Sequence, residues 1–360
     1  LLIDVLPDLV SNYKKWEDMR LEPDGLFWQV DGQDGMELAI GGHGKRPTIN
    51  TYMYADALAI SEIAAMAGKQ FSALRTQFSE KAKELKKKVL ETLWDEQDQF
   101  FEVMPRGTDS LSSTRELLGF VPWYLELVPR DQKYEVAWKQ LMDPQGFYAP
   151  FGPTTAEQRD PGFKVSYEGH ECQWNGPSWP FATSQTLTAL ANVLNNYQQN
   201  VISKEDYFKT LKIYTNSHRF RQIPPTGDTI VSDDLWIDEN LNPFNGDWLA
   251  RTRMEVQNYN HGFRERGIYY NHSTYCDLII TGLAGLRPSL DNQIIVMPLI
   301  PDHWDWFCLD KVNYKGHSIS IIWDKTGRKY HQGKGLLIFV DGKLKQKSSS
   351  LRELRQTIYP

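Results

Sequence analysis

Residues Phe27–Asp56 read FWQVDGQDGMELAIGGHGKRPTINTYMYAD, a glycine-rich acidic loop followed directly by an apolar segment. The acids in the loop are Asp31, Asp34 and Glu37. Five glycines between positions 32 and 44 disfavour helix and strand there, because glycine adopts backbone angles that other residues avoid. Pro47 ends the loop, and Thr48 is suited to cap the helix that follows. Such a loop suits either a catalytic acid or a solvated surface, and the stretch alone leaves both open.

The composition of the whole chain is that of a globular protein. It has 360 residues, of which 41% are hydrophobic and 24% charged, enough for one large domain and a small one. The formal net charge is -6 and there is no basic block, so nucleic acid and an anionic membrane surface are disfavoured as partners. No apolar run reaches the roughly 18 residues that a membrane span needs.

The cysteines and the start of the chain leave the compartment open. Cys172, Cys276 and Cys308 are too few and too scattered for a disulfide framework or a zinc site, and no cofactor is indicated. The chain begins LLIDVLPDLV without Met, which we interpret as a piece of a longer polypeptide with an upstream domain.

Aromatic residues are frequent, with 12 Trp, 17 Tyr and 16 Phe. A large core accounts for them, and composition alone favours that interpretation. The alternative is a carbohydrate site, since the flat apolar faces of sugars stack on aromatic rings. Trp28 and Tyr54, at the two ends of the acidic loop and its helix, are candidates for such contacts.

The apolar pattern predicts helices that alternate between buried and charged. Helical periodicity covers residues 2–19, 49–66, 71–94, 113–126, 131–142, 178–195, 204–221 and 271–286. Apolar segments such as 49–66 and 178–195 are each followed by a more charged one. Inner apolar helices paired with outer charged helices describe a mainly α fold, a toroid of helical hairpins.

Long loops and a β-region complete the predicted organisation. The loops 20–47, 98–112, 143–177 and 222–270 are rich in aromatic and acidic residues, and we expect them to be ordered and to build a cleft where they gather. After the helical domain 1–289, alternating runs in 290–347 predict a small β-region packed on the toroid. The tail 348–360 is expected to be frayed or a short helix.

Two further segments hold candidate site residues. In ECQWNGPSWPFATS, residues 171–184, Trp174 and Trp179 flank a Gly-Pro step that leads into a helix. They form either a hydrophobic plug or a sugar subsite, and their expected exposure on a loop favours the subsite.

In IDENLNPFNGDW, residues 237–248, Glu239 precedes a turn, with Trp236 and Trp248 on either side. A carboxylate held by a turn is suited to act as a general base, although the segment equally suits a surface turn. The competing acids are Asp233, Asp234, Asp238 and Glu255.

The last segment, YYNHSTYCD over residues 269–277, contains His272. No second His follows at i+4, so a hydrogen-bonding, substrate-positioning role is favoured over metal binding. There is no G-x-S-x-G, P-loop or C-x-x-C motif. What remains is acid and aromatic chemistry, as in glycoside hydrolysis, where one carboxylic acid protonates the leaving oxygen and one carboxylate activates water.

In their order along the chain these segments resemble motifs of the (α/α)6-toroid glycoside hydrolases, the six-hairpin glycosidases of the family 63, trehalase and mannosylglycerate-hydrolase-like group. Residues 34–37, DGME, resemble the acid loop S-G-M/W-D, and residues 49–68 resemble the buried aromatic helix that follows it. Residues 174–179 resemble W-x-G-P-x-W. Residues 239–246 resemble the base turn E-x-Y-N-P-x-T-G apart from Leu241 and Asn245. The resemblance covers roughly residues 1–290.

The resemblance implies an O-glycosyl hydrolase that inverts the anomeric centre. Glu37 corresponds to the general acid and Glu239 to the general base, 202 positions away (239 − 37). An inverting mechanism implies a carboxyl–carboxyl separation of ~6.5–9.5 Å. The family usually has Asp at the acid position, so Asp34 stays an alternative acid and Asp31 a supporting residue. The family also places several helices before the acid loop, so N-terminal hairpins of the toroid are expected to be missing from this chain.

Two other functions stay open. A polysaccharide lyase would recruit His272, Tyr270 and Arg264, but lyases need positive charge for uronic acids and the chain is acidic overall. A non-catalytic carbohydrate-binding toroid would hold sugars through Trp174 and Trp179 without turnover.

Overall fold

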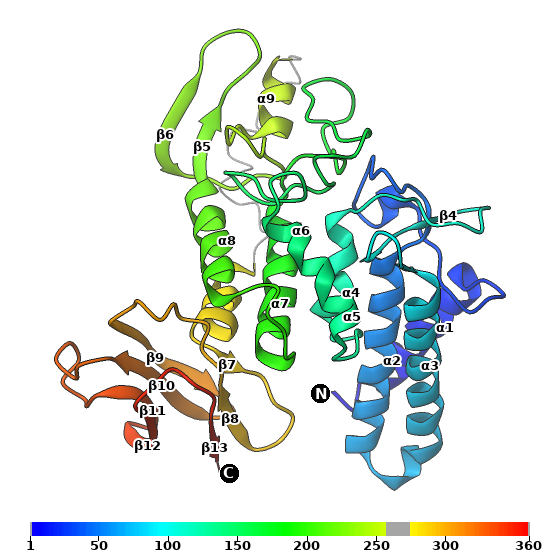
Figure 1. Ribbon diagram of the computed structural model, residues 1–360. Helices are drawn as coiled ribbons and strands as arrows, with labels where there is room; N and C mark the ends of the chain where they lie inside the picture. The colour runs from blue at the N-terminus through cyan, green and yellow to red at the C-terminus, as the bar shows by residue number, and fades with distance from the viewer. Residues whose placement is uncertain (1, 257–273, 359–360) are drawn as a thin grey trace.

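The computed structural model of the protein describes residues 2–256 and 274–358, with helices over most of the length and β-sheets at the C-terminal end (Figure 1). The α-helices are α1 (Leu6–Arg20), α2 (Pro47–Ala67), α3 (Ser72–Thr92), α4 (Val121–Tyr124), α5 (Gln132–Glu135), α6 (Lys139–Met142), α7 (Pro180–Asn196), α8 (Lys204–Ser217), α9 (Leu249–Val256) and α11 (Tyr275–Asp277). A 3-10 turn, Leu117–Phe120, precedes α4, and a π-helical segment, Leu278–Leu283, follows α11. Among the described residues, no helix combines the length and apolarity that crossing a membrane requires.

The predicted alternation of inner and outer helices is confirmed for two pairs. Helix α2 buries 12 of its 21 residues, whereas its partner α3 buries 4 of 21. Likewise α7 buries 12 of 17 residues and α8 buries 5 of 14. Local signals set the ends of α2, since Pro47 occupies its first turn and Gly68, at φ 106°, follows its last residue.

Two predicted helices were too long. The pattern over 113–126 forms only the 3-10 turn and the single turn of α4, because Pro122 has no N–H to donate and is accommodated only in a first helical turn. The helix expected to reach residue 221 ends at Ser217, and the chain continues as strand β5 (Arg219–Gln222). This strand pairs with β6 (Ile230–Leu235), a hairpin that the sequence did not indicate because the apolar residues of β6 are exposed.

Short strands also brace the N-terminal half. Strand β1 (Gly44–Lys45) pairs with β4 (Met104–Pro105), and β2 (Trp94–Asp95) pairs with β3 (Phe100–Phe101). At the β1–β4 crossing a Cβ on Gly44 would stand 2.1 Å from the Met104 carbonyl oxygen, so only glycine fits. The acidic loop is thereby attached to the loop 98–112.

The C-terminal region is two packed sheets. One has the order β12-β11-β10-β9 and the other β13-β8-β7, and they share a core of aliphatic residues and Trp323. The strands are β7 (Leu286–Arg287), β8 (Gln293–Val296), β9 (Trp306–Tyr314), β10 (His317–Asp324), β11 (Gly335–Val340), β12 (Lys343–Ser348) and β13 (Leu354–Thr357). The expectation of a frayed or helical tail is wrong, because β13 pairs antiparallel with β8.

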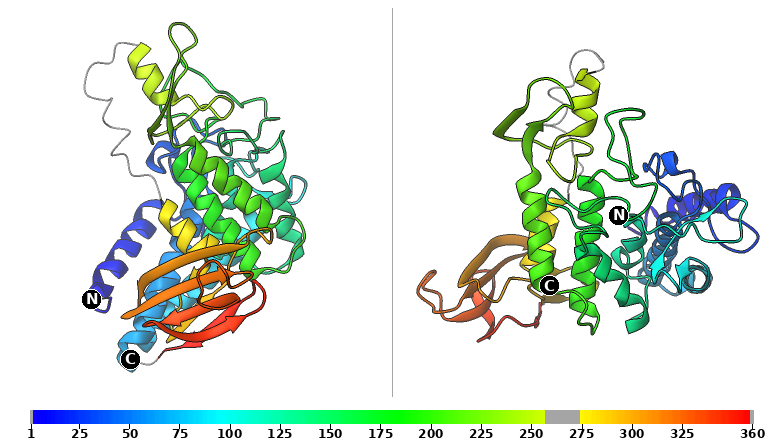
Figure 2. Two further views of the ribbon diagram at one scale, coloured as in Figure 1. Left: turned by 90° about the vertical axis from the view of Figure 1, so that its left-hand side faces the viewer. Right: turned by 45° about the horizontal axis from the view of Figure 1, so that its top comes forward.

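The two ends of the molecule are occupied by different parts of the chain. In Figure 1 the N-terminal ends of α2 and α7 point toward the upper end, where the acidic loop, the loop 143–177 and the segment after α8 lie. The C-terminal sheets lie at the lower end, and Figure 2 shows them from two further sides. Candidate site residues from distant parts of the sequence are thus carried on loops at the same end.

Candidate active site

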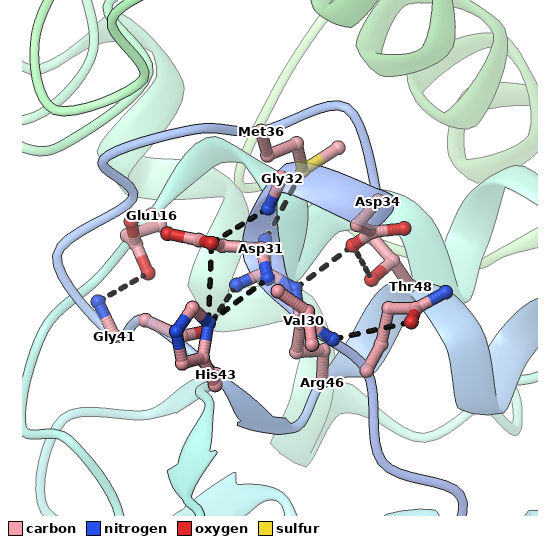
Figure 3. A network of polar contacts seen from close by, with 12 residues as sticks. Val30, Asp31, Gly32, Asp34, Met36, Gly41, His43, Arg46, Thr48 and Glu116 are labelled. Carbon is pink, nitrogen blue, oxygen red and sulfur yellow. Dashed lines mark hydrogen bonds and ion pairs between the residues drawn. The ribbon is translucent and has the colours of Figure 1, made fainter. Parts of the chain in front are cut away.

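The acidic loop is organised around the buried guanidinium of Arg46 (Figure 3). Its Nε lies 2.8 Å from Oδ2 of Asp34, its Nη1 donates to the Gly42 carbonyl at 2.6 Å, and its Nη2 contacts Sδ of Met36 at 3.3 Å. The Thr48 hydroxyl also donates to Asp34. Thr48 therefore does not cap α2 as expected, and Arg46 takes the N-cap position without a side-chain cap. The Asp34 carboxylate is therefore bound by Arg46 and Thr48, at the end of the loop and the start of α2.

A second carboxylate holds the far side of the loop. Glu116 accepts the N–H of Ile40 at 2.8 Å and of Gly41 at 3.1 Å. Burial raises the pKa of Glu116 to about 7, although the Arg46 charge and these two N–H groups act to lower it. The loop is thus fixed on one side by an ion pair and on the other by a carboxyl group that titrates near neutrality.

Asp31 has its partners within the loop itself. Its Oδ1 lies 3.1 Å from Nδ1 of His43, whose side chain is 58% exposed, and it also accepts the Gly32 N–H. These contacts are local to the loop and fit a supporting residue.

Glu37 and Glu239 both contact the short segment 172–174. The Glu37 carbonyl accepts the N–H of Trp174 at 3.0 Å. Two residues earlier, Sγ of Cys172 lies 3.3 Å from Oε2 of Glu239. Two residues of chain span at most about 7 Å, so the Glu37 backbone and the Glu239 carboxylate, 202 positions apart in sequence, contact the same loop within a short distance of each other. Glu37 is half-buried and Glu239 is buried.

The turn after Glu239 is tied down by buried charges. Oδ1 of Asp238 accepts the Glu239 N–H at 2.9 Å, and its Oδ2 pairs with Nε of Arg251 at 2.9 Å. Both side chains of this ion pair are at most 1% exposed. Further on, Asp247 accepts from the backbone of Ile223 and from the Thr252 hydroxyl. The backbone that carries Glu239 is therefore held by Asp238 before the turn and by Asp247 after it.

The expected exposure of Trp174 and Trp179 is wrong, because each is 4% exposed. Their rings stack on one another with centroids 4.4 Å apart and an interplanar angle of 19°. Nε1 of Trp179 donates to the Gln173 carbonyl at 2.7 Å. Such a pair contributes about 0.5–1.5 kcal/mol beyond its burial, and here it anchors the segment that contacts both glutamates.

The other predicted aromatic contacts lie in varied surroundings. Trp28 is half-buried, and the guanidinium groups of Arg20 and Arg106 lie 4.2 and 3.3 Å from its ring centroid. Tyr54 is buried in the helical core, and the ammonium of Lys86 on α3 lies over its ring.

Trp236 is 9% exposed, and the Arg251 guanidinium lies 4.5 Å from its ring centroid. Trp248 is fully buried and donates to the Arg219 carbonyl at 2.9 Å, so its ring supports the turn from inside.

The remaining candidate acids and bases do not join this site in the described part of the chain. Asp233 and Asp234 are exposed on β6, and within the described residues neither forms a hydrogen bond with the segment 172–174. His272, with Tyr270 and Arg264, lies outside the described residues, as does the side chain of Glu255.

Sequence reasoning missed four residues of this site: Arg46, Cys172, Glu116 and Tyr52. Tyr52 accepts a hydrogen bond from the Gln185 amide at 2.9 Å, and burial, reinforced by the charge of Asp34, raises the pKa of Tyr52 far above its usual value. The sequence offered one signal for Tyr52. It lies one turn into α2 and two residues from Tyr54, and because side chains two positions apart lie on different faces of a helix, Tyr52 and Tyr54 could be expected to have different surroundings.

The backbone of Glu37 and the carboxylate of Glu239 thus contact the same segment of a mainly helical chain. The family model described as mannosylglycerate hydrolase MGH1-like glycoside hydrolase domain matches residues 1–273. The chain belongs to this family. The model of the glycosyl hydrolase family 65 C-terminal domain matches residues 286–346, the region of the two sheets.

Two solved structures are similar to this chain. A protein named Sialidase is 44% identical and aligns with a TM-score of 0.87 over 98% of this chain and 31% of its own. The chain thus spans 31% of that protein's length. A conserved protein of Thermus thermophilus, described as uncharacterized, shares the fold at a TM-score of 0.52 and 11% identity, over 71% of this chain and 70% of that one.

Proposed function

We propose that the chain is the catalytic part of an inverting glycoside hydrolase, with Glu37 as general acid and Glu239 as general base. The observation that carries this proposal is the shared segment 172–174, which contacts the backbone of Glu37 and the carboxylate of Glu239. Inverting hydrolysis needs one carboxylic acid at the leaving oxygen and one carboxylate at a water on the opposite face of the sugar. Membership of the MGH1-like glycoside hydrolase family supports this reaction class.

The surroundings of Asp34 favour Glu37 as the acid. A general acid must be free to reach the glycosidic oxygen, whereas Oδ2 of Asp34 is engaged by Nε of the buried Arg46 and by the Thr48 hydroxyl. In this mechanism Asp34 therefore fixes the loop, and Glu37, three residues later, delivers the proton to the glycosidic oxygen.

For Glu239 the proposed role is to take a proton from the attacking water. The Cys172 thiol and the Glu239 backbone, which is held by Asp238, keep the carboxylate in one orientation. The stacked pair Trp174 and Trp179 supports the wall of the subsite from behind. Trp28 and Trp236, the less buried of the remaining Trp candidates, are the rings we propose for direct sugar contact.

The architecture is proposed to be an (α/α)6 toroid, of which residues 1–289 supply part. Residues 290–347 are assigned to the small β-region and 348–360 to the tail, in which strand β13 pairs with β8. The alternation of inner and outer helices in α2–α3 and α7–α8 supports this.

The experiment uses the full-length protein and its Glu37→Gln and Glu239→Gln variants. Aryl glycosides, disaccharides and sialosides are screened as substrates, and the anomer of the product is followed by NMR. Each variant is expected to lose about a hundredfold or more in kcat with binding retained. Glu37→Gln should keep more activity on aryl glycosides with acidic phenols, because such leaving groups need less protonation.

Glu171→Gln is the matched control, since Glu171 is exposed and lies on the same segment beside Cys172. Full activity in Glu37→Gln or Glu239→Gln removes that residue from the mechanism. An unsaturated product would indicate a lyase instead, and sugar binding without turnover would indicate a non-catalytic toroid.

A further inference from the structure

The C-terminal sheets, which lie at the end of the molecule opposite the acidic loop (Figure 1), carry a cavity of about 390 Å³. It lies on the face of the β12-β11-β10-β9 sheet that does not pack on the other sheet. Strand alternation separates the two faces: Ile319, Ile321 and Trp323 of β10 point into the shared core, and Ser318, Ser320 and Ile322 line the cavity. The cavity face is therefore not needed to hold the sheets together.

The cavity has an apolar floor and polar walls. Strand register places Ile322 beside Cys308 on β9 and Leu337 on β11, and Ser320 beside Phe339. Ile322, which is 7% exposed, and the half-buried Phe339 line the cavity and form its floor. Around them stand the hydroxyl, carboxylate, amide and phenol groups of Ser318, Asp310, Gln332 and Tyr330.

A structured loop forms one wall. The carboxylate of Asp324, 1% exposed, accepts the N–H groups of Gly327 at 2.7 Å, Lys329 at 2.8 Å and Tyr330 at 2.9 Å. Burial acts to raise the pKa of Asp324, but these N–H groups hold it below its usual value. The loop is thereby fixed before any ligand arrives, so ordering it costs no binding free energy.

Aromatic rings extend this wall to the rim. The Trp306 ring meets the Tyr330 ring edge to face, with centroids 6.3 Å apart. Trp306 is 51% exposed, which is unusual for so large an apolar side chain. The ammonium of Lys329 lies 4.3 Å from the centroid of the Trp306 ring and restrains it. Two rings at an angle thus stand beside a row of hydrogen-bonding groups.

We propose that this cavity is a secondary binding site for a neutral sugar ring of a glycan chain. Such a ligand has an apolar face for Tyr330 and hydroxyl groups for the side chains of Asp310 and Gln332. Oδ1 of Asp310 accepts from Ser320 at 2.5 Å, and within the described ranges no hydrogen bond engages its Oδ2. The charges of Asp310 and Lys311 balance in the lining, which suits an uncharged ligand. The choice of a glycan as ligand rests on the proposed function.

The site would keep a long substrate near the protein while the active site works on another part of it. Its consequence is multivalency, since a second weak contact raises the effective concentration of the glycan at the first. The expected effect is confined to polymeric substrates, because an aryl glycoside is too short to reach both ends of the molecule.

The test measures binding directly, by affinity electrophoresis of the full-length protein in gels containing neutral polysaccharides and by calorimetry with their oligosaccharides. Tyr330→Ala and Asp310→Asn are each expected to weaken binding at least tenfold. Tyr330→Phe keeps the stacking surface and should lose less. Asp302→Asn is the matched control, since Asp302 is exposed and does not line the cavity. Hydrolysis of an aryl glycoside should stay within twofold in all four variants, while KM for the polysaccharide rises in the first two.

Unchanged glycan binding in Tyr330→Ala and Asp310→Asn overturns the proposal, as does a wild-type protein that hydrolyses aryl glycosides but binds no polysaccharide in either assay. A drop in thermal stability of Tyr330→Ala without any change in binding also overturns it, and would indicate that another part of the protein covers this face. Binding that depends on Tyr330 in a protein without hydrolytic activity would support this site while removing the proposed function.

Discussion

The thiol of Cys172 lies 3.3 Å from Oε2 of Glu239, the carboxylate oxygen of the proposed general base. The two residues are 67 positions apart, and the contact is made by a half-buried loop against a buried turn. A thiol is a weak hydrogen-bond donor, and such a contact favours one orientation of the carboxylate that accepts it. The first prediction follows from this contact.

Replacing Cys172 by Ala should lower kcat/KM by about three- to tenfold, the effect of losing roughly one hydrogen bond. The loss should appear in kcat more than in KM, because the contact orients the carboxylate of the proposed base toward the attacking water. Cys172→Ser keeps a donor and should stay near wild type. Cys276→Ala is the control, as Cys276 is exposed. Equal kcat/KM in Cys172→Ala and wild type would mean that this contact does not matter for the reaction.

Substitution of Asp34 is expected to lower stability, whereas substitution of Glu37 is expected to lower catalysis. Asp34→Asn leaves the buried Arg46 guanidinium without its counter-charge, which typically costs about 3–5 kcal/mol. Its thermal midpoint should fall markedly, and activity should fall with it. Glu37→Gln should keep the wild-type midpoint while losing kcat. Thermal unfolding and steady-state kinetics on both variants check this, and a stable but inactive Asp34→Asn would instead identify Asp34 as the acid.

Local signals account for the parts of the fold that the sequence predicted well. Helix α2 was expected over 49–66 and runs over Pro47–Ala67, because a proline starts it and Gly68 stops it. The same reasoning overextended the segment 113–126, since apolar periodicity does not register that Pro122 must sit in a first turn. Strand β13 was missed because its pairing with β8 joins residues about 60 positions apart and leaves only a weak local pattern.

The candidate site also contains residues that local sequence patterns indicate and residues that only the tertiary structure reveals. Glu37 and Glu239 stood out because each sits in a short turn with recognisable neighbours. Burial of Trp174 and Trp179 could not be foreseen, because the two rings bury each other only after the loop folds back. Arg46 and Cys172 gave no sequence signal at all, since their roles depend on which carboxylates the tertiary structure sets beside them.

Gly41 should not tolerate a side chain. A Cβ there would stand 2.7 Å from Cβ of Val103 and 2.8 Å from Oε2 of Glu116. Gly41→Ala must therefore push the loop away from Glu116, which costs about 1–3 kcal/mol and misplaces Glu37. Activity should fall tenfold or more. In the control, Gly42→Ala, the new Cβ meets nothing within 4 Å, and only the strain of φ 62° is added. Equal activity in the two variants would show that the loop position does not matter.

Glu116 should make stability depend on pH between about 4.5 and 7. Burial raises the pKa of its carboxyl from 4.5 to about 7, so over this range the native state holds a proton that the unfolded state has released. The stabilisation is fully present below pH 4.5 and is lost as pH rises through 7, amounting to roughly 3 kcal/mol at most.

Glu116→Gln cannot titrate, so its free energy of unfolding should decline less than that of wild type between pH 4.5 and 7.5. Its amide should also lose one of the two N–H contacts, with Ile40 or Gly41, by an amount that does not vary with pH. Urea unfolding at a series of pH values separates the two effects, with the exposed Glu168→Gln as control. Parallel curves for wild type and Glu116→Gln would mean that Glu116 is already ionised at pH 5. The Arg46 charge and the two N–H groups would then outweigh burial, which would make Glu116 a permanent anchor of the loop instead of a pH-dependent one.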